Sequence, residues 1–140
     1  MTRFVLDTDM ISLLQRGHPT VAAHVGSYDP DELATTIITV EEQLSGWYTL
    51  LRRAKTVTEL VPVYERMSET VRFFGRLPLL TFTELAASIY ERLRKQKPRT
   101  GRMDLRIAAI ALAHHAAVVT RNASNFLDIE DLLVLDWSRQ

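Results

Sequence analysis

Apolar positions along this 140-residue chain recur with two different spacings. Short runs rich in β-branched and other apolar residues predict five buried strands, at residues 3–6, 33–40, 79–82, 117–120 and 132–137. Between these runs, apolar side chains recur every three or four positions, which is typical of amphipathic helices. Six helices are predicted in this way, at residues 10–17, 20–28, 41–55, 57–77, 83–97 and 104–116. Strands and helices therefore alternate along the chain.

This alternation predicts the fold class. Strands separated by helices pair in parallel through right-handed crossovers, and the helices pack on both faces of the sheet. We therefore expect an α/β protein, built as a three-layer α/β/α sandwich around a central, mostly parallel five-stranded sheet. Gly17 and Pro19 are expected to end the first helix, Thr83 to cap the helix at 83–97, and Pro62 to interrupt the helix at 57–77. The buried faces of these last two helices are predicted to be Val63, Met67, Val71 and Phe74, and Leu85, Ile89 and Leu93.

Composition sets further limits. Of the 140 residues, 46% are hydrophobic, which suits one domain spanning residues 1–140. Basic and acidic residues balance at 17 each, so no overall charge points to a nucleic-acid or membrane partner. The absence of cysteine excludes disulfides, thiolate zinc sites and a thiol nucleophile. Because the sequence has neither an apolar run of about 20 residues nor a signal-peptide pattern, we expect a cytoplasmic protein with no membrane partner.

Acidic side chains stand next to the ends of several predicted elements. Asp7 comes directly after the first strand, and Glu42 lies in the predicted first turn of the helix that follows the second strand. Asp104 begins the helix before the fourth strand, and Asn122 directly follows that strand. In a parallel α/β fold, the carboxyl ends of strands and the amino ends of helices share the edge where ligands bind. We expect these four side chains to meet there.

Three carboxylates that meet at one edge repel one another unless a cation neutralises them. Asp7, Glu42 and Asp104 are hard oxygen ligands, which suit Mg²⁺ or Mn²⁺ and leave positions for phosphate oxygens. A divalent ion activates water and stabilises the charge that gathers on a phosphodiester. The expected reaction is metal-assisted hydrolysis, with these three acids as the catalytic and metal-binding residues.

Polar neighbours of the acids have less specific roles. Asp9 is expected either to support the acids or to cap the helix that begins near it, with the cap favoured. Thr8, Ser12 and Thr120 carry hydroxyl groups that can orient carboxylates or water molecules, although each can equally serve as a local cap or turn residue.

A basic block occupies residues 92–102, where no acid interrupts the run "RLRKQKPRTGR". It leads directly into Asp104, so a phosphate backbone held there would reach the acids. The candidate RNA-binding residues are Arg94, Lys95, Lys97, Arg99 and Arg102. Basic residues at a helix end also complement the helix dipole, and a solvated helix face remains the alternative interpretation.

Five segments together resemble a known family. "FVLDTDMIS", "ITVEEQLSG", "GRMDLRIAAIAL", "VVTRNASNF" and "LLVLDW" are similar, in order and spacing, to segments of the PIN-domain ribonucleases of the VapC type, the toxin halves of toxin–antitoxin pairs. The resemblance spans nearly the whole chain. It implies a PIN-like fold, Mg²⁺- or Mn²⁺-dependent endoribonuclease activity, a homodimer, and inhibition by a cognate VapB-like antitoxin that lays an apolar helix in a groove and places a basic residue over the acids.

The resemblance also assigns roles by position. Asp7 corresponds to the first acid, Asp104 to the third, and Glu42 to the second, because it stands four residues before Gly46. Gln43 replaces the family's usual Leu, and Glu41 is a competing neighbour of Glu42. At the fourth position, where the family often has Asp, this chain has Asn122, which implies a weak ligand without charge and less firm binding of a second ion.

Two other functions fit parts of the pattern. The D-x-D sequence after the first strand is also the nucleophile motif of haloacid-dehalogenase-type phosphatases. That class needs a later Lys and a paired-acid motif on the same edge, whereas "GRMDLRI" has one acid. A catalytically silent PIN-like binding module would account for Asn122, but Asp7 and Asp104 are both present.

Overall fold

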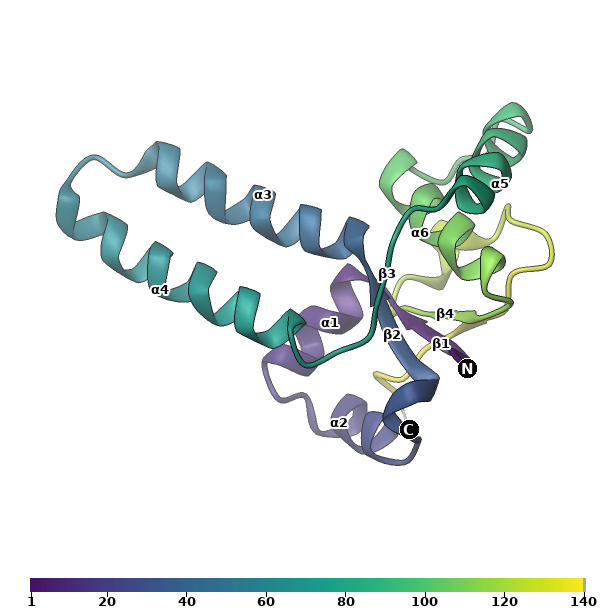
Figure 1. Cartoon of the computed structure of the whole chain (residues 1–140), viewed down its shortest axis with the longest axis horizontal. Helices are drawn as coiled ribbons and strands as arrows, with labels where there is room; N and C mark the ends of the chain where they lie inside the picture. The colour runs from purple at the N-terminus through teal and green to yellow at the C-terminus, as the bar shows by residue number, and fades with distance from the viewer. Residues whose placement is uncertain (140) are drawn as a thin grey trace.

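The computed structural model describes residues 1–139 and contains a five-stranded sheet (Figure 1). The strands are β1 (Phe4–Leu6), β2 (Leu33–Thr36), β3 (Leu79–Leu80), β4 (Ala117–Val119) and β5 (Val134–Leu135). Their order across the sheet is β3-β2-β1-β4-β5, and every neighbouring pair is parallel. Each predicted strand coincides with an observed one, but all are shorter than predicted and Leu79 of β3 is exposed; β1, which the first acid directly follows, is central. Gln140, the last residue of the predicted domain, lies outside the described residues.

Helices follow the strands as the sequence pattern predicts. They are α1 (Thr8–Gln15), α2 (Pro19–Gly26), α3 (Ile37–Arg53), α4 (Val57–Phe74), α5 (Glu84–Lys95) and α6 (Arg102–Ala113). Two short 3₁₀ turns, η1 (Pro30–Glu32) and η2 (Ala123–Phe126), precede β2 and follow β4. None of the helices in residues 1–139 is long and apolar enough to cross a membrane.

The sheet divides the core into two layers because successive side chains of a strand point to opposite faces. On one face, Val5 of β1 and Val118 of β4 pack in the cluster that contains the apolar residues of α5 and α6. On the other face, Phe4 and Leu6 pack with residues of α1 and α2. The expected three-layer α/β/α sandwich is confirmed, with an all-parallel sheet.

The α3 and α4 helices form an antiparallel hairpin whose outer part projects away from the sheet (Figure 1). This hairpin exposes several large apolar side chains, namely Tyr48, Leu50, Val57, Val61, Tyr64 and Val71. The exposure of Val71, at 58%, corrects its predicted place on the buried face of α4, where the buried residues are Thr70 and Phe74. Pro62 lies inside α4 without ending it, because the carbonyl group that it leaves unpaired is near the exposed start of the helix.

The end of the second strand differs from the prediction. β2 stops at Thr36, whose side chain accepts a hydrogen bond from the Thr39 N–H and caps α3. The β-branched run continues into the helix, so this cap overrides the strand preference of Ile37 and Ile38. Glu42 therefore lies in the second turn of α3, and no acid occupies its first turn.

Two smaller corrections concern α5 and α6. Thr83 caps α5 as predicted, but the buried residues are Ala86, Ile89 and Leu93, while Leu85 is exposed. The α6 helix begins at Arg102 after Gly101, two residues earlier than expected, which places Asp104 in its first turn.

Candidate active site

The side chain of Asp7 is both a helix cap and the most buried of the three predicted acids. Asp7 follows β1 directly, and its Oδ1 accepts a hydrogen bond of 2.9 Å from the Met10 N–H at the start of α1. Its side chain also accepts a hydrogen bond from Thr120. Only 5% of Asp7 is exposed, and this burial raises its pKa from 3.8 to about 6 despite both hydrogen bonds. Asp7 is therefore an acid whose charge is poorly solvated.

The cap of α1 is therefore Asp7, which corrects the preference for Asp9 in that role. Asp9 lies in the first turn of α1, and both of its carboxylate oxygens accept hydrogen bonds from Arg121, each at 2.9 Å. An acidic residue suits this turn because the positive end of the helix dipole is there. The charge of Asp9 is thus already paired with a cation of the chain.

Glu42 reaches the edge of the sheet from α3. It is half-buried, and its Oε1 accepts a hydrogen bond from the Thr8 hydroxyl, which also bonds to the Thr39 hydroxyl at 3.2 Å. Burial raises the pKa of Glu42, and the charges of Asp104 and Glu41 raise it further. Glu41 itself is exposed. Of the two competing glutamates, Glu42 is therefore the one that contacts the polar groups of α1.

Asp104 approaches the same edge from the first turn of α6. It is half-buried, and burial raises its pKa, while a hydrogen bond from the side chain of Asn125 partly offsets this effect. The negative charge of Asp104 raises the pKa of both Asp7 and Glu42. Asp104 therefore lies near enough to both other acids for its charge to oppose theirs, whereas no repulsion between Asp7 and Glu42 contributes to the pKa of either.

The chemistry of these donors fits a hard divalent cation, although the described residues do not yet form a closed cage. Among residues 1–139, no group of three or more His, Cys, Asp or Glu side chains is close enough to hold an ion as the side chains stand. No Lys or Arg is among the groups that set the pKa of Asp7, Glu42 or Asp104, and all three values are raised. A cation would relieve the repulsion, and carboxylate oxygens are the ligands that Mg²⁺ and Mn²⁺ prefer.

Two predicted supporting residues are placed differently from the expectation. The Ser12 hydroxyl donates to the Thr8 carbonyl oxygen at 3.0 Å, inside α1, and it faces Gln43 rather than an acid. Asn122 is exposed, and its backbone N–H donates to the Thr120 Oγ1 at 3.0 Å. The amide that bonds to an acid is that of Asn125, three residues further along.

Sequence reasoning missed Asn125 and Arg121. Both lie in the predicted segment "VVTRNASNF", but only Asn122 was singled out in it. The η2 turn begins at Ala123, and three residues per 3₁₀ turn bring Asn125 back to the side of Asn122. Asn122, Ser124 and Asn125 are turn-forming residue types, and they were the signal in the sequence for a turn after β4.

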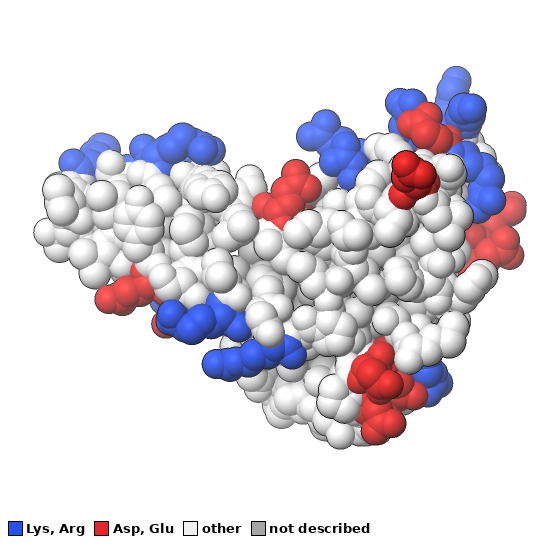
Figure 2. Space-filling view, viewed as in Figure 1, with Lys and Arg blue, Asp and Glu red and all other residues white. Residues whose placement is uncertain are grey.

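The basic block lies beside this turn. Arg94, Lys95, Lys97, Arg99 and Arg102 are all exposed, and Figure 2 shows Lys and Arg side chains gathered over α5. Beyond α5, the Arg99 N–H donates to Asp128 Oδ2 at 2.9 Å, and the Thr100 hydroxyl donates to the Asn125 carbonyl at 2.7 Å. These bonds attach the loop between α5 and α6 to the segment in which Asn125 hydrogen-bonds to Asp104. The block thus continues to the acidic edge, although Arg94 also pairs with Glu91 at 3.0 Å.

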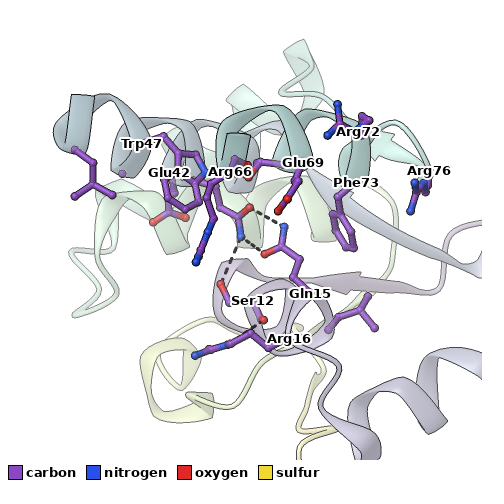
Figure 3. A pocket seen from close by; sticks show the side chains of 15 residues that line it. Ser12, Gln15, Arg16, Glu42, Trp47, Arg66, Glu69, Arg72, Phe73 and Arg76 are labelled. Carbon is purple, nitrogen blue, oxygen red and sulfur yellow. Dashed lines mark hydrogen bonds between the residues drawn. The ribbon is translucent and has the colours of Figure 1, made fainter. Parts of the chain in front are cut away.

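A groove of about 790 Å³ opens from Glu42 between α1 and the α3–α4 hairpin (Figure 3). Its middle is bridged by Gln15 and Gln43, whose amide groups exchange two hydrogen bonds of 2.9 Å. Four arginines line it, namely Arg16, Arg66, Arg72 and Arg76. Among the ion pairs of residues 1–139, none involves these arginines. The groove therefore joins one acid of the edge to a wall that carries four arginines and one further acid, Glu69.

Comparison with known proteins agrees with this architecture. No protein-family profile matches the chain. Ribonuclease VapC1 of Haemophilus influenzae (strain R2866) is 28% identical over 138 residues, which are 97% of this chain and 98% of that protein. The solved structure of VapBC-1 from nontypeable Haemophilus influenzae is 27% identical, with a TM-score of 0.72 over 99% of this chain and 100% of that one. The DNA-bound VapBC from Salmonella typhimurium is 25% identical, with a TM-score of 0.76 over 98% and 99% of the two chains.

The fold and the acidic edge define an α/β/α protein of the PIN-like class. Within that class, the chain is similar to VapC-type ribonucleases over nearly its full length, so the resemblance seen in the sequence motifs is confirmed.

Proposed function

We propose that this protein is a Mg²⁺- or Mn²⁺-dependent endoribonuclease and the toxin of a type II toxin–antitoxin pair. The observation that carries this proposal is that Asp7, Glu42 and Asp104 approach one edge of the sheet, where the charge of Asp104 raises the pKa of both other acids and no Lys or Arg is among the groups that affect the pKa of the three. The similarity to ribonuclease VapC1 supports RNA as the substrate.

In this proposal the three acids hold the ion through their carboxylate oxygens. When bound, the ion supplies positive charge that stabilises the phosphodiester transition state and favours deprotonation of the attacking water. The chain's own groups orient the acids: Thr120 hydrogen-bonds to Asp7, Thr8 to Glu42 and Asn125 to Asp104. Because the pKa of Asp7 is about 6, its carboxylate is mainly ionised above that pH, and below it protons compete with the cation for the carboxylate.

The basic block supports RNA binding rather than the chemical step. Its side chains are exposed, and the loop after α5 is hydrogen-bonded to the turn that carries Asn125. Phosphates bound by Lys95, Lys97 or Arg99 would place the neighbouring backbone near Asp104. This contribution to affinity depends on salt, because binding releases counterions from the RNA.

The groove supports an antitoxin segment as the partner. Solved relatives include VapBC and FitAB complexes. In this chain the groove begins at Glu42, which suits a basic residue of the partner, and continues to Arg66 and Arg72, which suit acidic residues. We also propose a cytoplasmic homodimer, for which the exposed apolar side chains of the α3–α4 hairpin offer contact area.

One experiment tests the activity against its alternatives. Purified protein is incubated with mixed cellular RNA and, separately, with a phosphomonoester, each with Mn²⁺, Mg²⁺ or EDTA. Internal cleavage of RNA that EDTA abolishes supports the proposal. Hydrolysis of the phosphomonoester alone would support a phosphatase, and no reaction with either substrate would support a silent binding module.

A further inference from the structure

The ion pair between Asp9 and Arg121 joins two segments that are 112 residues apart in the sequence. Nε and one terminal nitrogen of Arg121 donate to the two carboxylate oxygens of Asp9, both at 2.9 Å. This two-pronged geometry fixes the plane and direction of the guanidinium group as well as its distance. The pair therefore constrains the relative position of the two backbones.

Both segments carry groups that surround the predicted acids. Asp9 is in the first turn of α1, two residues after Asp7, which caps that helix. Arg121 is preceded by Thr120, whose hydroxyl bonds to Asp7, and is followed by the η2 turn that carries Asn125 to Asp104. The ion pair thus links the start of α1 to the segment that orients two of the acids.

An ion pair at this exposure contributes little to global stability. The side chains of Asp9 and Arg121 are 26% and 47% exposed, and ion pairs at such exposure contribute little to the free energy of unfolding. Residues 120–126 are anchored on either side of Arg121: the Thr120 N–H donates to the Leu135 carbonyl oxygen, and Phe126, which is 1% exposed, packs in the core, while the Asn125 carbonyl oxygen accepts from Thr100. Arg121 lies between these anchors. Among the described residues, the side chains of 120–126 bond to residues 7–15 at two places: Thr120 to Asp7 and Arg121 to Asp9.

We propose that Asp9 and Arg121 form a positioning pair that holds residues 120–126 against α1 and so orients Asp7 and Asp104 through Thr120 and Asn125. Its catalytic consequence rests on the proposed function, but its structural consequence does not. Asp9 acts here as the partner of Arg121 and not as a ligand of the ion.

The test compares Asp9→Asn, Arg121→Gln, the double variant and Arg121→Lys with the unchanged protein. Hydrogen exchange is measured without metal or RNA, and peptides covering residues 120–126 should lose protection in both single variants. Binding of Mn²⁺, measured by calorimetry, should weaken about tenfold, which is typical when a group that orients a metal ligand is lost. The double variant should be no worse than either single variant, because both remove the same interaction. Arg121→Lys keeps the charge without the two-pronged geometry, so its Mn²⁺ affinity should fall between those of the unchanged protein and Arg121→Gln.

A matched control is Arg3→Gln, which removes an ion pair of 3.2 Å between Arg3 and Glu32. This pair also joins distant segments, but it lies at the opposite end of β1 from Asp7, so exchange at 120–126 and Mn²⁺ binding should not change. The alternative role for Arg121 is phosphate binding, since a guanidinium group released from Asp9 would be free to bind phosphate at this edge.

Two results would overturn the proposal. If Asp9→Asn strengthened RNA binding while Arg121→Gln weakened it, and exchange at 120–126 stayed unchanged, Arg121 would be a phosphate-binding residue that Asp9 restrains. If the effects of the two single variants on Mn²⁺ binding simply added in the double variant, the two side chains would act independently. Failure of the proposed function is a separate result, because it would appear as absent RNA cleavage by the unchanged protein.

Discussion

The acidic edge of the sheet and the groove differ in how far their charged side chains are exposed to water. At the edge, the acids follow a strand or lie near the start of a helix and are buried or half-buried. In the groove, arginine side chains project into solvent from α4 and from the residues just after α1 and α4. Asp7 follows β1 without an intervening residue and is 5% exposed. Arg66 and Arg72 lie on the outer hairpin and are exposed. The acids of the edge are therefore partly or fully withdrawn from water, whereas the arginines of the groove are hydrated.

This difference separates chemistry from recognition. Groups at the edge are poorly solvated, so their charges strongly affect one another and would bind a cation firmly. Groups in the groove are hydrated, so each contributes modestly to the affinity for a partner. Together they act through the pattern of charge that they present to it. Glu42 belongs to both regions, which lets a partner in the groove reach the acids.

The largest expected effect is the loss of catalysis at the edge. Asp104→Asn should lower RNA cleavage at least 100-fold, an order of magnitude typical of essential groups that act on developing charge. The fold should be unchanged, because the variant removes one of several mutually repelling carboxylates. Initial rates with Mn²⁺ and circular dichroism of the same preparation check this. Cleavage at the original rate would refute the nuclease assignment.

A second effect concerns stability and its dependence on pH. The pKa of Asp7 is about 6 in the folded protein and about 3.9 in an unfolded chain, so the folded state binds this proton more tightly. Ionisation of Asp7 therefore costs folded-state stability, which is lost as pH rises from about 4 through about 6. Without metal at pH 7.5, Asp7→Asn should stabilise the protein by about 3 kcal/mol, given a pKa difference of about two units and about 1.4 kcal/mol per unit.

Asn also caps helices well, so this variant keeps the start of α1. Denaturant titrations at pH 4 and 7.5 provide the measurement, and the gain should disappear at pH 4. Asp7→Ala is the control, since it removes the same charge but also the cap, at a cost of about 1 kcal/mol. An equal gain at both pH values would mean that ionisation of Asp7 is not its cause.

In the groove, the expected change is in partner binding. Replacing Arg66, Arg72 and Arg76 together by Gln should weaken binding of the cognate antitoxin about tenfold or more, and the loss should shrink at high salt. Calorimetric binding of Mn²⁺ should be unchanged, because these residues do not affect the pKa of any acid at the edge. A salt-independent loss would indicate that shape and not charge is recognised there.

The smallest effect distinguishes two neighbouring amides. Asn125→Asp places a fourth carboxylate where the amide now bonds to Asp104, and it should tighten Mn²⁺ binding several-fold while lowering stability without metal. Asn122→Asp is the matched variant, and it should change both quantities less because the side chain of Asn125, and not that of Asn122, lowers the pKa of Asp104. Titration of both variants with Mn²⁺ gives the comparison. A stronger effect from Asn122→Asp would restore the role that the sequence motif implied for it.

Local pattern was enough to predict the layers of the fold and the position of the three acids. The spacing of apolar side chains distinguishes strands from helices. Parallel pairing then places the carboxyl end of every strand at one edge of the sheet. Asp7 and Asp104 were singled out in this way because each stands next to an element boundary, whereas Glu42 was singled out because the helix was predicted to begin at residue 41 and not at Ile37. The true end of β2 was missed, since the Thr36 cap and the β-branched run favour different structures at the same residues.

Contacts between distant segments were decided only by the tertiary structure. Three contacts depend on which elements the sheet order brings together. They are the ion pair of Asp9 with Arg121, the hydrogen bond of Asn125 to Asp104, and the two hydrogen bonds between the side-chain amides of Gln15 and Gln43. β4 lies beside β1 although 110 residues separate Leu6 and Ala117. A local pattern does not contain this neighbourhood, because long-range packing chooses one sheet order among those compatible with the same elements.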